Sequence, residues 1–180
     1  EAFSDLSLPV HHHNSLGWSV GAFFAPERLR GANKFACGAC GALTEATRAS
    51  RLRRLPPLLT LHLKRFAQAD AADVVAEGRR VGRHVAMPAE LRLALWAAPD
   101  CRHASARYEL YAIVAHAGRS GCGHYTCYVK AAANVGLPPR SWLCFDDEDC
   151  HVLTADDVSA LFAPSSQSAA LACLVFYSRQ

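Results

Sequence analysis

The sequence predicts an α+β domain built around a mostly antiparallel sheet, and three observations lead to this fold class. Strand-like patterns follow one another closely in the second half of the chain, at 108–116, 123–130, 142–145 and 171–177. A further run, 58–66, alternates leucines with polar residues, as a half-buried strand does. Helical patterns are few, and runs of strands with few helices between them are typical of antiparallel sheets.

The composition fits one globular domain. The 180 residues are 51% hydrophobic and 19% charged, which is enough for a single core of useful size. The net charge of +3 is small, and the arginines lie in scattered groups without interleaved aromatic residues, so we expect no nucleic-acid binding. Charges, glycines or prolines interrupt every apolar run well before the roughly 18 residues of a membrane span, so we expect a soluble chain.

The start of the chain and its cysteines indicate where the protein works. Residues 1–5 are acidic where a secretory signal would be basic and then apolar, and the chain does not begin with Met. We therefore expect a piece of a longer or trimmed polypeptide. Of the eight cysteines, only Cys37 and Cys40 have a recognisable spacing, so free thiols in a reducing, intracellular compartment are expected.

The first half contains an extended start, one helix and one clear strand. Apolar residues alternate over 3–10. Ser15 is suited to cap a helix whose apolar spacing continues to Phe24, before Pro26. The leucines of 58–66 recur at every second position, so they are expected to face the core from one side of a strand.

Between and after the strands, the sequence predicts connections and a second helix. The segment 67–82 has little periodicity and is expected to be a mobile connection, and 96–105 is expected to be a loop. A short strand and a turn are expected within 85–91. A short helix is expected from Thr154 to Phe162, with Asp157 at the acidic position of a capping box.

Cys37 and Cys40 form a knuckle. The neighbouring glycines permit the tight turn that lets both sulfur atoms reach one metal ion. Zinc requires four ligands, and the chain holds no second pair with such spacing. The pair is therefore half of a structural zinc site that needs a second cysteine pair upstream of Glu1, or it is a relic of such a site. The alternative is a glycine-rich hairpin tip that carries two free thiols.

Two strand-like stretches carry groups that a thiol protease uses. His124, framed by glycines, lies near the start of the first stretch, and Asp146 closes the second. Pairing of the two strands would bring the imidazole and a carboxylate that fixes its tautomer face to face, which is two thirds of a catalytic triad. Asp147 would orient water or a developing oxyanion. Spacing alone leaves a second interpretation open, a core histidine satisfied by a surface carboxylate.

Residues on both sides of the histidine are candidates for substrate binding. Gly123 would allow the backbone of a substrate tail to approach closely, because glycine has no side chain. Tyr125 would wall a narrow channel.

Four blocks of the sequence, in this order, resemble the ubiquitin-specific protease family, the papain-like deubiquitinases. The blocks are Cys37-Gly38-Ala39-Cys40; Leu55-Pro56 through Leu61-His62-Leu63-Lys64-Arg65-Phe66; Tyr108 through Gly118 with Gly123-His124-Tyr125-Thr126-Cys127-Tyr128; and Trp142 through Asp147 with Leu174-Val175-Phe176-Tyr177. The resemblance implies a papain-like fold in which residues 1–180 form the fingers and palm. It implies that His124 is the general base, Asp146 its orienting acid and Asp147 an auxiliary near the oxyanion.

The resemblance also implies a reaction and partners. The reaction is hydrolysis of the isopeptide bond after the C-terminal glycine of ubiquitin or a ubiquitin-like modifier, with no cofactor in catalysis. Members of the family are usually cytosolic or nuclear. Residues 115–118 replace the Asn-His-Ser-Gly that is commoner in the family. The segment 145–154 is similar in layout to the interferon-linked branch, which removes an interferon-stimulated modifier, whereas Lys64 follows the broader family.

One feature of the family is missing from the sequence. The nucleophile of the family lies in an Asn-x-Gly-Asn-Thr-Cys-like box in the thumb, and no such box occurs here. Cys122 is two residues from His124, and such neighbours on one strand face do not align a thiolate, a base and a carbonyl. We therefore expect an inactive C-terminal fragment of a cysteine isopeptidase. The alternative is a non-catalytic adaptor that binds ubiquitin or a like modifier; a zinc-knuckle interaction domain is disfavoured because two ligands do not close a site.

Overall fold

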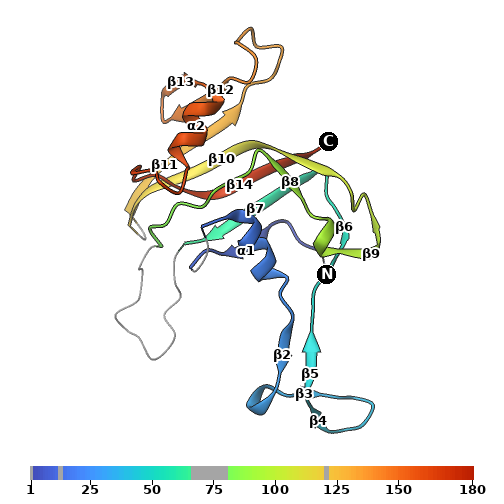
Figure 1. Cartoon of the computed structure of the whole chain (residues 1–180). Helices are drawn as coiled ribbons and strands as arrows, with labels where there is room; N and C mark the ends of the chain where they lie inside the picture. Colours follow the sequence, from blue (N-terminus) through green and yellow to red (C-terminus); the bar gives the residue numbers. More distant parts are fainter. Residues whose placement is uncertain (1, 12–13, 66–80, 120–121) are drawn as a thin grey trace.

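An eight-stranded sheet forms the centre of the computed structural model, which describes residues 2–11, 14–65, 81–119 and 122–180 (Figure 1). The strand order is β1-β7-β14-β10-β11-β12-β13, and β8 also pairs with β10. The strands are β1 (Leu6–Pro9), β7 (Leu58–Lys64), β8 (Glu90–Arg92), β10 (Arg107–Arg119), β11 (Cys122–Lys130), β12 (Trp142–Asp146), β13 (Asp149–Leu153) and β14 (Leu171–Arg179). Within this sheet β1 and β7 pair in parallel and the other pairs are antiparallel, as predicted.

The core lies on the face of the sheet that meets both α-helices. Leu59, Leu61 and Leu63 of β7 are buried, and the residues between them are more exposed, which confirms the predicted alternation. Helices α1 (Leu16–Phe23) and α2 (Ala155–Leu161) add apolar side chains to the same core cluster as β7, β10 and β14. These helices and strands therefore stabilise one another, because their apolar side chains pack in a single core.

The two helices begin where the sequence predicts. Ser15 is the extended N-cap residue of α1, although its side chain makes no capping hydrogen bond. In α2, the Thr154 hydroxyl accepts a hydrogen bond from the backbone N–H of Asp157, and the Asp157 carboxylate accepts one from the backbone of Thr154. This reciprocal pair is the predicted capping box. No described helix is long and apolar enough to cross a membrane.

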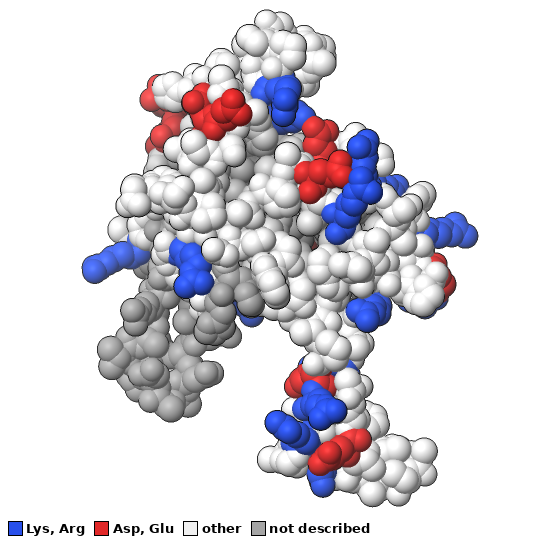
Figure 2. Space-filling model, in the orientation of Figure 1, with Lys and Arg blue, Asp and Glu red and all other residues white. Residues whose placement is uncertain are grey.

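A narrow arm extends away from the large sheet between α1 and β7 (Figure 1). It contains the pairs β2 (Glu27–Leu29) with β5 (Ala46–Arg48) and β3 (Phe35–Ala36) with β4 (Leu43–Thr44), and the 3₁₀ turn η1 (Gly31–Asn33). Basic and acidic side chains lie side by side on the arm in Figure 2, and Arg48 pairs with Glu27 at 2.6 Å. Charge of both signs leaves the arm without an extended field of one sign.

Several elements differ from the prediction. The turn η3 (Ala94–Trp96) ends where the expected loop 96–105 begins, and that segment contains β9 (Ala97–Arg102), which pairs in parallel with β6 (Leu52–Arg54). Strand β13 was not predicted, because nearly all of its side chains are exposed and it therefore lacks an apolar alternation. The expected strand within 85–91 is reduced to a bridge between Ser15 and Ala86 and to β8. The expected connection 67–82 lies almost wholly outside the described residues.

Candidate active site

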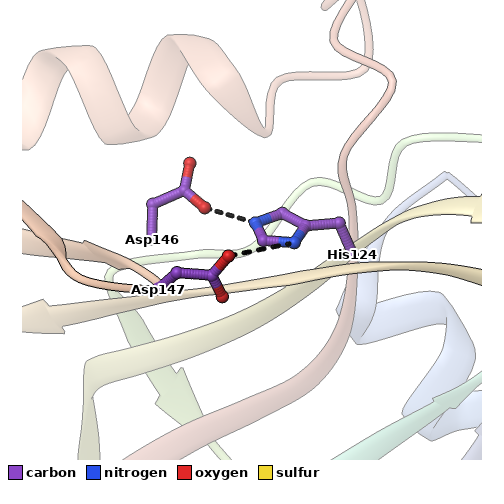
Figure 3. A group of neighbouring side chains, drawn as sticks. All are labelled: His124, Asp146 and Asp147. Carbon is purple, nitrogen blue, oxygen red and sulfur yellow. Dashed lines mark hydrogen bonds and ion pairs between the residues drawn. The ribbon is translucent and has the colours of Figure 1, made fainter.

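Strands β11 and β12 bring the two predicted site residues together. They pair antiparallel, with Cys127 opposite Phe145, so the start of β11 lies beside the end of β12. The His124 Nε2 donates a hydrogen bond to Oδ1 of Asp146 (Figure 3). On the other side of the ring, Nδ1 lies 4.0 Å from Oδ2 of Asp147. The three groups expected from the sequence are therefore neighbours in space.

The pair is open to solvent. The side chains of His124 and Asp146 are 47% and 46% exposed, and that of Asp147 is 81% exposed. A core histidine satisfied by a carboxylate would be buried, so the second interpretation that the spacing left open does not describe this pair. The open face leaves room for a further reactant at the imidazole.

The two carboxylates act on the charge state of the imidazole. The hydrogen bond to Asp146, the charge of Asp146 and then the charge of Asp147 raise the pKa of His124 above its ordinary value of 6.5, and slight burial opposes them. The protonated imidazole is thus favoured more than in a free histidine. If His124 acts as a base, its raised pKa stabilises the imidazolium that forms when it accepts a proton.

The hydrogen bond to Asp146 also selects the tautomer. A carboxylate only accepts, so the proton of the neutral ring lies on Nε2 and the lone pair lies on Nδ1. The basic nitrogen consequently points away from Asp146, to the side where Asp147 lies (Figure 3). Ligand atoms of all three groups lie within 4.8 Å of one another, and the two carboxylates are at opposite nitrogens of the ring.

Asp147 takes its position from the turn between β12 and β13. It has a φ of 51°, in the left-handed region that aspartate tolerates better than most residues. Asp146 pairs with Asp149, so only Asp147 and Glu148 connect the two strands. This tight turn directs consecutive carboxylates to the two sides of one imidazole.

The candidate substrate-binding residues lie on both sides of His124 in β11. Tyr125 is 60% exposed, and its ring lies against that of His116, with centroids 4.7 Å apart. Gly123 has no room for a side chain, since a Cβ there would lie 2.1 Å from Nε2 of His116. His116 was not among the site residues predicted from the sequence. The pairing of the two predicted strands 108–116 and 123–130 was the available signal for it.

No cysteine joins the histidine and the carboxylates. Among the described residues, the one close group of three or more His, Cys, Asp or Glu side chains is His124, Asp146 and Asp147. Cys122 is exposed on the same strand, two residues before His124. Burial raises the pKa of the Cys127 and Cys144 thiols, which makes them poor nucleophiles.

The predicted metal knuckle lies at the tip of the arm, between β3 and β4. The Cys37 N–H donates to the Ala42 carbonyl at 3.0 Å, and the Gly41 N–H donates to the Cys37 carbonyl at 2.9 Å. Hydrogen bonds from the backbone and side chain of Cys40 lower the pKa of the Cys37 thiol. A thiolate-favouring turn fits zinc, but it offers two of the four ligands, and no described group of three or more ligands includes it.

The α+β fold with a mostly antiparallel sheet, which pairs an imidazole with a carboxylate, matches the papain-like class of fold. The family model for ubiquitin carboxyl-terminal hydrolase matches residues 27–177, and the chain belongs to this family. Ubiquitin carboxyl-terminal hydrolase creB of Emericella nidulans is 34% identical over 178 residues, which are 98% of this chain and 22% of that protein. Probable ubiquitin carboxyl-terminal hydrolase creB of Aspergillus niger gives the same values.

Solved structures show the same fold. A chain of the yeast SAGA DUBm with an Sgf73 mutant has a TM-score of 0.75 and 25% identity, over 99% of this chain and 35% of that one. The SAGA DUB module Ubp8/Sgf11/Sus1/Sgf73 bound to monoubiquitin gives a TM-score of 0.73 and 23% identity, again over 99% and 35%. The chain thus spans about a fifth of the length of these curated relatives and about a third of these structures.

Proposed function

We propose that this chain supplies the general base and the orienting acid of a cysteine-type deubiquitinase. Its substrate is the isopeptide bond after the C-terminal glycine of ubiquitin. The observation that carries the proposal is the hydrogen bond from His124 Nε2 to Asp146, in a solvent-exposed position where β11 begins and β12 ends, in a chain of the ubiquitin carboxyl-terminal hydrolase family. The nucleophilic thiol comes from polypeptide outside these 180 residues, since none of the described cysteines joins the group.

The geometry suggests the order of proton transfers. Nδ1 of His124 accepts the proton of the incoming thiol, and Asp146 stabilises the imidazolium that forms. The thiolate attacks the carbonyl carbon of the terminal glycine, and Nδ1 then gives its proton to the departing lysine amine. A water molecule gives a proton to the same Nδ1 and attacks the thioester carbon, the C–S bond breaks to release the carboxylate of the terminal glycine, and Nδ1 returns the proton to the departing thiolate. Asp147, 4.0 Å from Nδ1, is placed to orient that water or to act near the oxyanion.

The other parts of the chain fit this proposal in distinct ways. We assign the large sheet to the palm and the arm that contains β2 to β5 to the fingers, so that residues 1–180 are the fingers and palm of a longer catalytic domain. Cys37 and Cys40 would hold a structural zinc ion together with a second cysteine pair from outside these residues, and catalysis would need no cofactor. The eight free cysteines support a cytosolic or nuclear location.

Ubiquitin is the first candidate modifier, because the relatives are named for it. The interferon-stimulated ubiquitin-like modifier is the second candidate, on the basis of the segment 145–154 and of the departure from the commoner family sequence at 115–118. A non-catalytic adaptor remains a different class of function, and the lack of a cysteine beside His124 favours it. The three candidates make different predictions in one experiment.

The experiment is covalent labelling of the native polypeptide that contains this chain. Two probes are used, ubiquitin and the interferon-stimulated modifier, and each carries an electrophile at its C-terminus. Labelling by the ubiquitin probe is expected, and both His124→Ala and Asp146→Ala should slow it by orders of magnitude. Asp156→Ala, on the exposed start of α2, is the matched control. Binding of ubiquitin without labelling would indicate the adaptor and overturn the proposal.

Residues 1–180 alone provide a second test. We expect no turnover of a fluorogenic ubiquitin substrate by this chain. Turnover that survives His124→Ala would mean that the base is misassigned. Turnover that needs His124 would mean that one of the eight cysteines is the nucleophile.

A further inference from the structure

The tip of the His116 ring occupies the space that a side chain at position 123 would need. A Cβ built on Gly123 would lie 2.1 Å from Nε2 and 2.6 Å from Cε1 of His116, and 2.5 Å from the carbonyl oxygen of Ala117. His116 is only 5% exposed and is paired with Tyr125 across the β10–β11 ladder. The contact with His116 therefore requires glycine at position 123, whether or not a substrate also approaches it.

Tyr125 covers the same imidazole. The two rings have centroids 4.7 Å apart and planes inclined by 49°. Tyr125 is 60% exposed, so the tyrosine forms the outer layer and His116 the layer beneath it. Because side chains alternate along a strand, Gly123 and Tyr125 lie on one face of β11 and His124 lies on the other. One buried ring thus contacts both residues that flank the candidate base.

We propose that His116 is a positioning residue for His124. Its Nε2 and Cε1 atoms set how closely the backbone at Gly123 packs onto β10, and its ring supports Tyr125. The peptide units before and after His124 are thereby held from the opposite face of the sheet, which keeps the imidazole in reach of Asp146. The role of His124 as a base rests on the proposed function. The positioning of its side chain by His116 depends only on contacts within this chain.

Two substitutions of His116 distinguish a role of the ring tip from a role of the ring atoms nearer the backbone. The side-chain amide of glutamine reaches the position of the histidine Nε2, whereas that of asparagine ends near the position of Nδ1. His116→Gln therefore keeps a group against Gly123, and His116→Asn removes it while it keeps a polar group near the backbone. A role of the ring tip predicts that His116→Gln preserves the site and His116→Asn does not. A role of the polar group near the backbone predicts the reverse.

The readout is the titration of His124 in the 180-residue chain, followed by NMR of its Cε1–H group. We expect the raised pKa of His124 to persist in His116→Gln and to fall towards 6.5 in His116→Asn, as the contact with Asp146 loosens. The backbone amide resonance of Gly123 should move further in the asparagine variant than in the glutamine variant. Thermal midpoints of both variants report general damage to the fold. An asparagine variant that titrates like the parent, or two variants that are equally altered, would overturn the proposal.

If the variants of the buried His116 do not fold, a substitution on the partner strand β11 tests the same contact. Gly123→Ala places a methyl group against the tip of His116, and it should lower the pKa of His124 in the same way. Gly17→Ala, where the nearest atom is at an ordinary 3.8 Å, is the matched control and should leave His124 unchanged. Tyr125→Ala, at an exposed position, should speed hydrogen exchange at Cε1 of His116, and an unchanged rate would contradict the layered arrangement.

Labelling of the native polypeptide by the ubiquitin probe then links positioning to function. We expect His116→Asn to slow labelling about 100-fold and His116→Gln to slow it far less, since a displacement of about 1 Å has such an effect on a reacting group. The NMR readouts need no nucleophile and no modifier. An altered His124 titration with unchanged labelling would therefore count against the proposed function, and it would leave the positioning by His116 standing.

Discussion

His124 hydrogen-bonds to Asp146 along a diagonal of the β11–β12 ladder. The two residues are separated by 22 positions in the sequence. The register puts Cys127 opposite Phe145, so its continuation puts Thr126 opposite Asp146 and leaves His124 one diagonal step further on the same face. A slip of one residue would turn His124 to the other face and abolish the contact. The packing of Tyr128 and Cys144 into the core prevents that slip.

Removal of the charge on Asp146 should lower the pKa of His124. Asp146→Asn keeps the shape of the side chain but removes the carboxylate that contributes most to the raised value, so the pKa should fall towards 6.5. Because the folded pKa is raised, the pair stabilises the fold fully below about pH 6.5, and this contribution is lost as the pH rises through the folded value.

Two measurements check this prediction. NMR titration of the His124 ring gives the pKa directly. Unfolding in urea at several pH values should give Asp146→Asn a lower free energy of unfolding than the parent in mild acid and the same free energy of unfolding in alkali. Asp156→Asn removes a similar charge from the exposed first turn of α2 and should leave the titration unchanged. A difference in stability that grows towards high pH would contradict the sign.

The alternation in β7 should govern the stability of the sheet. Leu61 is fully buried in the core, whereas Leu58, three residues earlier in the same strand, is 59% exposed. Leu61→Ala should lower the free energy of unfolding by about 2–5 kcal/mol, because it removes apolar contacts and leaves a cavity. Leu58→Ala is the matched control and should have a much smaller effect. Urea denaturation of both variants measures the difference, and equal losses would mean that β7 does not face the core as described.

The sequence predicts the features whose signal is local. The leucines of β7 have a period of two, and the capping box of α2 lies within four consecutive residues, Thr154 to Asp157. The pairing of His124 with Asp146 was also predictable, because both residues belong to apolar strands whose inner faces are fixed by their neighbours. In the first two cases the side chains that decide the structure are close together in the sequence, whereas His124 and Asp146 lie 22 positions apart on two strands that each carry their own local pattern.

The features that were missed depend on distant partners. Strand β9 contains Pro99 and Asp100 and has no regular alternation, and it becomes a strand only by pairing with β6, about 45 positions earlier. Strand β13 is almost entirely exposed, so only the ladder to β12 defines it. The contact between His116 and Gly123 requires the register of the β10–β11 hairpin, which a pattern of single residues does not contain.

Cys37 should be more reactive towards an alkylating reagent than Cys127 and Cys144 of the sheet. Hydrogen bonds from Cys40 lower the pKa of its thiol, whereas burial raises the pKa of Cys127 and Cys144. The thiolate is the reactive form, so iodoacetamide near neutral pH should modify Cys37 early and Cys144 last. Peptide mapping after short exposures gives the order. Cys40→Ser should slow the reaction of Cys37, and a faster reaction at Cys144 would contradict the arrangement.

The capping box of α2 should make its contribution to stability in a pH-dependent way. Hydrogen bonds from the hydroxyl and backbone of Thr154 lower the pKa of Asp157 below 3.8. A lowered folded pKa means that the stabilisation is present above the ordinary value and is lost as the pH falls through the folded value. Thr154→Ala removes the hydroxyl and should cost about 1 kcal/mol at neutral pH, as loss of a helix N-cap does.

This cost should shrink below about pH 4, because the protonated Asp157 of the parent no longer accepts the two hydrogen bonds as a carboxylate. Urea denaturation at pH 7 and pH 3 measures both effects. Ser159→Ala, at an exposed position of the same helix, is the control that changes helix propensity without touching the cap. A cost of Thr154→Ala that is the same at both pH values would mean that the cap does not depend on the charge of Asp157. Since α2 packs Val158 against the sheet that carries His124 and Asp146, loss of the cap should also broaden the NMR signal of His124.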